Sequence, residues 1–476
     1  MRLRSMLLPG LVGLGSASPA RPQGVPPIAF THATVIDVEK GTSLAGMTVV
    51  AANGRITALG RDGSVTPPVG ARTVDATGKF LIPGLWDMHV HAAFPGVDAL
   101  FLPLLVANGV TGVREMFSRL DWVDSARARV NRGDFPGPRM VASGHILDGT
   151  PPIWPGSVAV ATAAEARRAV DSLAAGGADF IKVYSRLSPE AFFAAAREAK
   201  AKGLPFAGHV PSLVSAAQAS DSGQRSVEHL TNIIAGCSTQ EQSYLAELAA
   251  AVASPGGWDS AGKVSRGNLN LLASYSPERC RALARRFVSN GTWMVPTIAV
   301  LHSVAYLDDS TLALDPRLRY IPPAFKQAWN PRTDFRFKML TPEDWKNRKA
   351  GYARQLELVT LLHAEGVKFL AGTDLSNPFI YPGFSLHDEL ASLVAAGFTP
   401  AEALRAATID PARYLGAADS LGSIVPGKRA DLVLLGGNPL ENIRNTTRIA
   451  AVMANGRFYD SVAIAKMLAD GAARAK

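Results

Sequence analysis

Cysteine is scarce in this 476-residue chain, which contains only Cys237 and Cys280. Two thiols cannot build a disulfide framework, and neither lies in a CxxC motif or beside a candidate base. A single bridge between them is one alternative, but we expect two buried free cysteines, which behave as small apolar side chains. A disulfide-rich scaffold is therefore excluded.

Long basic runs and membrane-length apolar runs are also missing. The net charge is +9 and the pI is about 9.6, but the Lys and Arg residues are scattered, often in alanine-rich stretches such as residues 163–168. No zinc-finger spacing or aromatic platform accompanies them, so we expect a solvated basic surface and no nucleic-acid partner. No stretch is apolar over enough residues to span a bilayer, so we expect no membrane span.

The first residues follow the order of a secretory signal. Two arginines precede a short apolar run at residues 6–14, and small residues follow at 16–20. This order predicts a signal peptide over residues 1–24 and a secreted or periplasmic protein.

Short strands are indicated near both ends of the remaining chain. Apolar runs at 28–37, 47–52, 55–59 and 72–75 are matched by runs at 430–435 and 449–453. Asn53-Gly54 and Asn455-Gly456 are strong signals for two-residue hairpin turns, because both positions tolerate positive φ. We predict a small β-sandwich domain assembled from residues 25–82 and 417–476.

The middle of the chain alternates short apolar strands with alanine-rich helices. Eight strand candidates occur, at residues 81–92, 111–117, 139–147, 179–185, 205–211, 225–230, 293–300 and 368–375. This alternation predicts an α/β fold, a (β/α)8 TIM barrel over residues 83–416. Two excursions, 231–291 and 301–349, are too long for simple connections and are expected to form lids or binding loops. The second contains Tyr320, Trp329 and Trp345, so it is a candidate wall of a substrate pocket.

Polar residues fall at the C-terminal ends of these predicted strands. His89 and His91 are two residues apart in a strand, so both imidazoles point to the same side. His209, His229 and Asp374 end the fifth, sixth and eighth strands. A lone histidine is usually a hydrogen-bonded structural residue. The active sites of TIM barrels lie at the C-terminal ends of the strands, so several histidines and an aspartate at these ends predict a metal site.

Lys182 lies inside the apolar strand Phe180-Ile181-Lys182-Val183. Burial of an ammonium is costly and favours the neutral amine, which can react with CO2 to form a carbamate with two metal-binding oxygens. The alternative is a lysine that extends to solvent from the end of the strand.

The chain resembles the amidohydrolase superfamily, and within it the imidazolonepropionase-like, Xaa-Pro dipeptidase-like and ochratoxinase-like members that carry a carboxylated lysine. The motifs that carry the resemblance are IPG-x-x-D-x-H-x-H, DFIKVY, GHV, EHL, GTD and G-x-I-x-x-G-K-x-A-D-L-V. They extend over nearly all of the chain after the leader.

The resemblance implies a centre of two divalent metal ions. One ion would be held by His89, His91, Lys182 and Asp374, and the other by carboxylated Lys182, His209 and His229. Zinc is the default, and Mn²⁺, Co²⁺ and Ni²⁺ also suit these ligands. A hydroxide that bridges the ions would attack the substrate carbonyl, with Asp374 as general base and then acid.

Four further residues are candidates with weaker support. His145 and Tyr184 could act in catalysis, and Tyr184 could also hydrogen-bond the substrate, although structural packing is an equal alternative for both. Arg114 and Arg186 could bind a substrate carboxylate through two parallel hydrogen bonds from the guanidinium group. The alternative for both is an ion pair at the surface or within the structure.

We predict hydrolysis of an amide bond in a small peptide-like or N-acyl amino acid substrate, by a homo-oligomer. One alternative keeps the metals but acts on a lactone, carbamate or phosphotriester. The other is a non-catalytic binding protein with the same fold.

Overall fold

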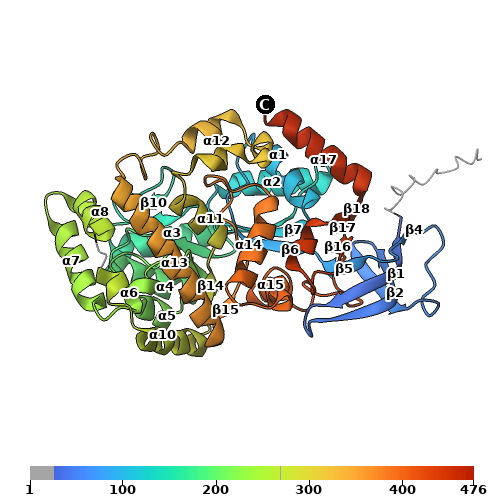
Figure 1. Ribbon diagram of the computed structural model, residues 1–476, viewed down its shortest axis with the longest axis horizontal. Helices are drawn as coiled ribbons and strands as arrows, with labels where there is room; N and C mark the ends of the chain where they lie inside the picture. Colours follow the sequence, from blue (N-terminus) through green and yellow to red (C-terminus); the bar gives the residue numbers. More distant parts are fainter. Residues whose placement is uncertain (1–25, 268–269) are drawn as a thin grey trace, which may run out of the picture.

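The computed structural model describes residues 26–267 and 270–476. Figure 1 shows a β layer built from both chain ends on one side of the molecule, and alternating helices and strands in the rest. The predicted signal peptide lies outside the described residues. Within the described ranges, no helix is long and apolar enough to cross a membrane.

The β layer is one hydrogen-bonded sheet in the order β18-β17-β16-β5-β1-β2-β3, with β4 paired to β1. β1 runs parallel to β4 and β5, and the other pairs are antiparallel. Its strands are β1 (Ile28–Asp37), β2 (Thr42–Ala52), β3 (Arg55–Arg61), β4 (Arg72–Asp75), β5 (Phe80–Pro83), β16 (Leu432–Leu435), β17 (Ile449–Ala454) and β18 (Arg457–Asp460). Both chain ends thus share one sheet, because β5 pairs with β16.

The two Asn-Gly pairs form the predicted hairpin turns. Asn53 and Gly54 have φ values of 52° and 70°, and Asn455 and Gly456 have 50° and 76°. The sheet also curls back on itself, since the ring centroids of Phe30 in β1 and Phe458 in β18 are 5.9 Å apart although three strands separate them. A division of this curled sheet into the two layers of a sandwich stays a prediction.

The second architecture consists of parallel strands. They form a seven-stranded set, β10-β9-β11-β12-β13-β14-β15, and a three-stranded set, β6-β7-β8, in which every pair is parallel. The strands are β6 (Leu85–Val90), β7 (Val110–Glu115), β8 (Arg139–Ala142), β9 (Leu147–Asp148), β10 (Val158–Ala159), β11 (Ile181–Val183), β12 (Phe206–Gly208), β13 (Ser226–Glu228), β14 (Trp293–Val295) and β15 (Lys368–Phe369). The predicted α/β class is confirmed.

The first predicted strand, residues 81–92, needs a correction. It is two strands, because β5 pairs with β16 in the β layer whereas β6 pairs with β7 among the parallel strands. Gly84 joins them where a side chain would collide with Thr111, since an added Cβ would lie 2.0 Å from Thr111 Oγ1. The sequence shows one apolar run, and only the pairing partners divide it.

Helices alternate with the parallel strands and pack around them. They are α1 (Asp98–Ala107), α2 (Leu120–Arg132), α3 (Ala163–Ala175), α4 (Pro189–Ala201), α5 (Ala216–Asp221), α6 (Ile233–Gly236), α7 (Glu241–Ala253), α8 (Gly257–Gly267), α9 (Asn270–Ala273), α10 (Pro277–Asn290), α11 (Ile298–Ala305), α12 (Pro323–Ala328), α13 (Pro342–Ala364), α14 (Phe384–Ala395), α15 (Pro400–Ala406), α16 (Ile409–Tyr414) and α17 (Ser461–Arg474). The described residues also form the 3-10 helices η1 (Ser310–Leu314), η2 (Pro316–Tyr320) and η3 (Ile443–Thr447).

Both long excursions are helical. The first contains α6 to α10, and α7 and α8 lie at the end of the molecule opposite the β layer (Figure 1). The second contains α11, η1, η2, α12 and the start of α13, whose 23 residues begin with proline after a Thr341 cap. These two excursions are therefore helical insertions between the repeating strand and helix units.

The expectation of two free cysteines is wrong, because Cys237 and Cys280 form a disulfide. Cys237 directly follows α6, and Cys280 lies in the first turn of α10. The backbone brings them together, since Ser276 N donates to Cys237 O at 2.8 Å. Their separation of 43 residues gave the sequence no sign of this proximity.

Candidate metal centre

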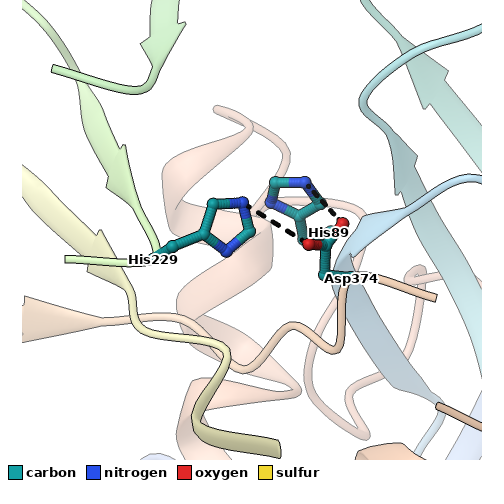
Figure 2. A group of neighbouring side chains, drawn as sticks. All are labelled: His89, His229 and Asp374. Carbon is teal, nitrogen blue, oxygen red and sulfur yellow. Dashed lines mark ion pairs between the residues drawn. The ribbon is translucent and has the colours of Figure 1, made fainter. Parts of the chain in front are cut away.

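The six predicted ligands lie in or shortly after five of the parallel strands: His89 and His91 with β6, Lys182 in β11, His209 after β12, His229 after β13 and Asp374 after β15. Asp374 Oδ1 is 3.4 Å from His89 Nε2 and 3.1 Å from His91 Nε2. Asp374 Oδ2 is 3.6 Å from His229 Nε2. Figure 2 shows the imidazoles of His89 and His229 directed at this carboxylate from different strands.

The imidazoles form a continuous group. The ring centroid of His229 lies 4.6 Å from that of His89 and 5.0 Å from that of His209, and His89 lies 5.4 Å from His91. The sequence-predicted histidines are therefore brought together. Ligand atoms of His89, His229 and Asp374 all lie within 4.8 Å of one another.

The free ring nitrogens fit a metal centre. Nδ1 of His89 hydrogen-bonds to Glu228 Oε2 at 2.8 Å, that of His209 to Ser185 at 2.8 Å and that of His229 to Thr297 at 2.7 Å. The Nε2 atoms of His89 and His209 are buried and have no hydrogen-bond partner among the described residues. Ligand histidines typically have one nitrogen held by a neighbour and the other directed at the metal.

Two of these candidate ligands have a left-handed backbone conformation. His229 and Asp374 have φ values of 56° and 60°, and Thr297, which holds His229, has 50°. These are left-handed conformations that β-branched and other side chains adopt at a cost of roughly 1–3 kcal/mol each. Such strain persists where the surrounding structure fixes it, as at binding and catalytic sites.

Lys182 is buried, so the alternative of a lysine that reaches solvent is wrong. Only 1% of the residue is exposed, and its ammonium forms no ion pair with another described residue. Burial lowers the pKa of Lys182 to about 8, against the opposing attraction of Glu228 and Asp374. The neutral amine is therefore accessible close to neutral pH.

The pKa of Asp374 reflects its neighbours. Burial would raise the pKa of this carboxyl, but the charges of His229 and His91 and the hydrogen bond from His91 outweigh burial and lower it to about 2. Asp374 is consequently ionised at neutral pH. A carboxylate surrounded by imidazoles is a suitable ligand set for Zn²⁺ and related ions.

Arg114 is not a substrate ligand, which corrects the sequence prediction. Its side chain is fully buried, and its terminal nitrogen donates to both carboxylate oxygens of Glu228 at 2.9 Å. The other donors reach Met88 O at 2.7 Å, Ser226 Oγ at 3.0 Å and Tyr414 at 3.0 Å. The guanidinium therefore fixes Glu228, which in turn holds His89 Nδ1.

The remaining candidates lie at different places around the centre. Tyr184 packs against His209 with ring centroids 3.9 Å apart and the rings tilted by 31°, and its hydroxyl accepts a hydrogen bond from Trp154 Nε1 at 2.8 Å. His145 is half-buried, and its Nδ1 donates to the carbonyl oxygen of Gly156 at 2.7 Å. Only Tyr184 of this pair contacts a predicted ligand among the residues described.

Arg186 is partly exposed and engaged elsewhere. Its guanidinium donates to Pro151 O at 2.8 Å and lies 5.5 Å from the ring centroid of Trp258. Its backbone N–H donates to the buried Asp148. These contacts favour the structural alternative for Arg186.

Sequence reasoning missed the residues that support the ligands. Asp87 accepts hydrogen bonds from the N–H of His89 at 3.2 Å and from Thr373 Oγ1 at 2.6 Å, and burial raises its pKa to about 7. Glu228 precedes His229 directly, and Asp87 stands two residues before His89. Their buried acidic positions within the IPG-x-x-D-x-H-x-H and EHL motifs were the available signal.

The fold and these side chains together define an α/β protein with a candidate metal centre. Residues 352–459 match the model of the amidohydrolase family. Curated relatives align over short stretches: Adenine deaminase 2 of Rhizobium meliloti (strain 1021) is 40% identical over 106 residues, which are 22% of this chain and 17% of that protein.

Solved structures match over most of the chain. A bottromycin amidohydrolase has a TM-score of 0.69 at 24% identity, with 97% of this chain and 95% of that one covered. A Xaa-Pro dipeptidase with bound methionine has 0.65 at 20% identity, with 91% and 100% covered. The ochratoxinase of A. niger has 0.64 at 19% identity, with 91% and 96% covered. The resemblance predicted from the motifs is confirmed, and so is the prediction of a hydrolase-class enzyme at the level of this family.

Proposed function

We propose that this chain is a binuclear metal-dependent amidohydrolase that cleaves an amide bond in a small peptide-like or N-acyl amino acid substrate. The observation that carries the proposal is the convergence of His89, His91 and His229 on Asp374. His209 packs against His229, and the buried Nε2 atoms of His89 and His209 have no hydrogen-bond partner among the described residues. The bottromycin amidohydrolase and the Xaa-Pro dipeptidase support the choice of an amide bond.

We also propose that the parallel strands close into a (β/α)8 barrel. Hydrogen bonds at both edges support closure: Met88 N donates to Ala371 O at 2.9 Å beside β6, and Asp179 N donates to Ala142 O at 2.8 Å between β8 and β11. A further parallel bridge links Val90 to Leu375. The site then lies at the C-terminal face, where active sites of this fold occur.

Two divalent ions, zinc by default, would fit these residues. One would be held by His89, His91, Lys182 and Asp374, and the other by Lys182, His209 and His229. When bound, such ions polarise a carbonyl group and lower the pKa of water toward 7. Lys182 can serve both ions only as a carbamate, and its lowered pKa supplies the neutral amine that CO2 requires.

The chain's own groups would then move a proton and orient the substrate. Asp374 is ionised at neutral pH, so one of its carboxylate oxygens can accept a proton and later release it to the leaving nitrogen. Burial raises the pKa of Tyr184, so its phenol stays protonated and can donate a hydrogen bond to the substrate. His145 would have to release Gly156 O to act in the same way.

We further propose that the protein is exported. The order of charge, apolar run and small residues before residue 25 supports export, and the Cys237–Cys280 disulfide suits an oxidising compartment. N-terminal sequencing of protein from the envelope of its native host should start near Arg21 to Val25. An intact Met1 on the mature protein would contradict export.

Activity should be tested on protein purified without chelator and supplied with Zn²⁺ and bicarbonate. Dipeptides and N-acyl amino acids should be hydrolysed, whereas lactones, carbamates and phosphotriesters should be poorer substrates. Metal analysis of the same sample should give close to two ions per chain. Turnover of lactones or phosphotriesters alone would favour the first alternative, and no turnover with full metal content would favour a binding protein.

A further inference from the structure

A cavity of about 410 Å³ borders the candidate centre, because His229, one of the six candidate ligands, forms part of its wall. The other walls come from the segment after β13, from α7 to α9 and from α13 with the residue Leu340 before it. Its volume lies in the range of roughly 300–1,000 Å³ that is common for small-molecule sites. Both long excursions therefore contribute to a space large enough for a small substrate.

Charged side chains in this cavity are unbalanced. Arg348 and Arg266 are the cations in its lining, and Asp344 is the acid. The carboxylate of Asp344 is already used at the start of α13, where it accepts hydrogen bonds from Thr341 N at 2.8 Å and Thr341 Oγ1 at 2.7 Å. The lining therefore has a surplus of positive charge.

Of these two cations, Arg348 lies on the long helix α13 and has no ion-pair or hydrogen-bond partner among the described residues. It lies half-buried on α13, and its guanidinium lies 5.2 Å from the ring centroid of Phe337. Among the residues described, no carboxylate lies within ion-pair distance of it and no carbonyl accepts from it. Burial lowers the pKa of Arg348, and the attraction of Asp344 opposes this effect without cancelling it, because Arg336 and Arg266 also lower the pKa.

We propose that Arg348 binds the carboxylate of the substrate in the cavity that begins at His229. The substrate would then be an N-acyl amino acid or dipeptide with a free carboxylate, its amide carbonyl at the metal centre and its carboxylate at α13. A partly desolvated guanidinium is stabilised by an anion, and its planar fork matches a carboxylate with two parallel hydrogen bonds. This inference rests on the proposed function and adds its substrate class.

The first test measures binding without chemistry. Calorimetry on chelator-free protein compares 3-phenylpropionate with the neutral 3-phenylpropan-1-ol, neither of which contains an amide bond. Arg348→Gln should weaken binding of the acid by about tenfold to a hundredfold, as expected for loss of a charge-assisted hydrogen bond, and leave the alcohol unchanged. The matched control is Lys346→Gln on the same helix, since its side chain is 78% exposed and outside the cavity lining.

The second test measures turnover. For a hydrolysed N-acyl amino acid, Arg348→Gln should raise KM with little change in kcat, while the corresponding C-terminal carboxamide should be unaffected. Arg348→Lys keeps the charge but not the fork, so it should lose part of the preference for the acid. This second variant also serves if Arg348→Gln does not fold.

The results separate the two proposals. Equal binding of the acid by wild type and both Arg348 variants overturns the inference, even if amides are hydrolysed. Loss of acid binding in Arg348→Gln, in a protein that hydrolyses no amide, supports the anion site and contradicts the proposed function.

Discussion

Arg114→Met is the substitution that best tests how the candidate centre is held together. Arg114 is fully buried, as is Glu228, and two 2.9 Å hydrogen bonds join them. Among the described residues, removing the guanidinium leaves the buried Glu228 carboxylate with hydrogen bonds from Ser226 and His89 and with no ion-pair partner apart from the His89 ring. Breaking a buried pair in this way costs about 3–5 kcal/mol, because the remaining charge is uncompensated.

The expected loss can be measured by urea unfolding of the metal-free protein. Arg119→Met is the control, because Arg119 and Asp121 form an exposed pair with 53% and 61% of their side chains accessible. A surface pair contributes at most about 1 kcal/mol. Adding Glu228→Gln to Arg114→Met should recover part of the loss, since the double variant no longer buries an unpaired charge.

The same substitution should weaken metal binding. Glu228 orients His89 through Nδ1, and loss of such support typically lowers metal affinity by about 10- to 100-fold. If Arg114→Met instead keeps wild-type stability and metal content and raises only KM, Arg114 contacts substrate and the structural reasoning is wrong.

Three further predictions follow from buried groups. Lys182→Ala should lose most of the bound metal and most of the turnover, and adding a short carboxylic acid to this variant should restore some activity. Lys182→Arg should be equally impaired, because a guanidinium cannot form a carbamate. Two bound metal ions and wild-type turnover in Lys182→Arg would refute this prediction. Burial raises the pKa of Glu389 to about 8, so the folded state keeps a proton that the unfolded chain releases near its ordinary pKa of 4.5. Stability should therefore fall as pH rises from about 4.5 to 8, and Glu389→Gln should flatten that dependence in urea unfolding. Cys237→Ala should lower the free energy of unfolding by up to about 4 kcal/mol, because the disulfide closes a loop over a separation of 43 residues. If the wild-type protein has the same urea unfolding midpoint with and without reductant, this prediction is contradicted.

The ligand positions could be predicted from the sequence because strand geometry is local. His89 lies in β6 and His91 directly follows its last residue, so the spacing of two directs both toward the same site. Lys182 lies within β11, and the other candidate ligands follow strands whose C-terminal ends meet. The same argument misled at Arg114. Its position in β7 resembles that of a site residue, but its partner Glu228 is 114 residues away, and only the folded chain shows that the two charges neutralise each other.

Residues of the long excursions were beyond prediction for another reason. Trp329 and Trp345 line another cavity than the one beside His229, and their expected place in the wall of the substrate pocket stays a prediction. Nothing in the periodicity of residues 301–349 identifies which side chain faces a cavity. In the sequence, Arg348 is indistinguishable from an ordinary surface arginine of a helix. Its significance arises because Asp344, four residues earlier, is used by the Thr341 cap.

The two sides of the candidate centre differ in a way that bears on substrate approach. His89 is 1% exposed in its side chain and is held by the charged pair of Glu228 and Arg114, both of which are fully buried. His229 is 13% exposed, is held by the neutral hydroxyl of Thr297 and faces the cavity that contains Arg348. Because the buried charges close one side and the cavity opens the other, a substrate should reach Asp374 past His229. A bulky replacement at Leu340, which lines that cavity, should then obstruct large N-acyl amino acids more than small ones, whereas an equal effect on both would argue for another route.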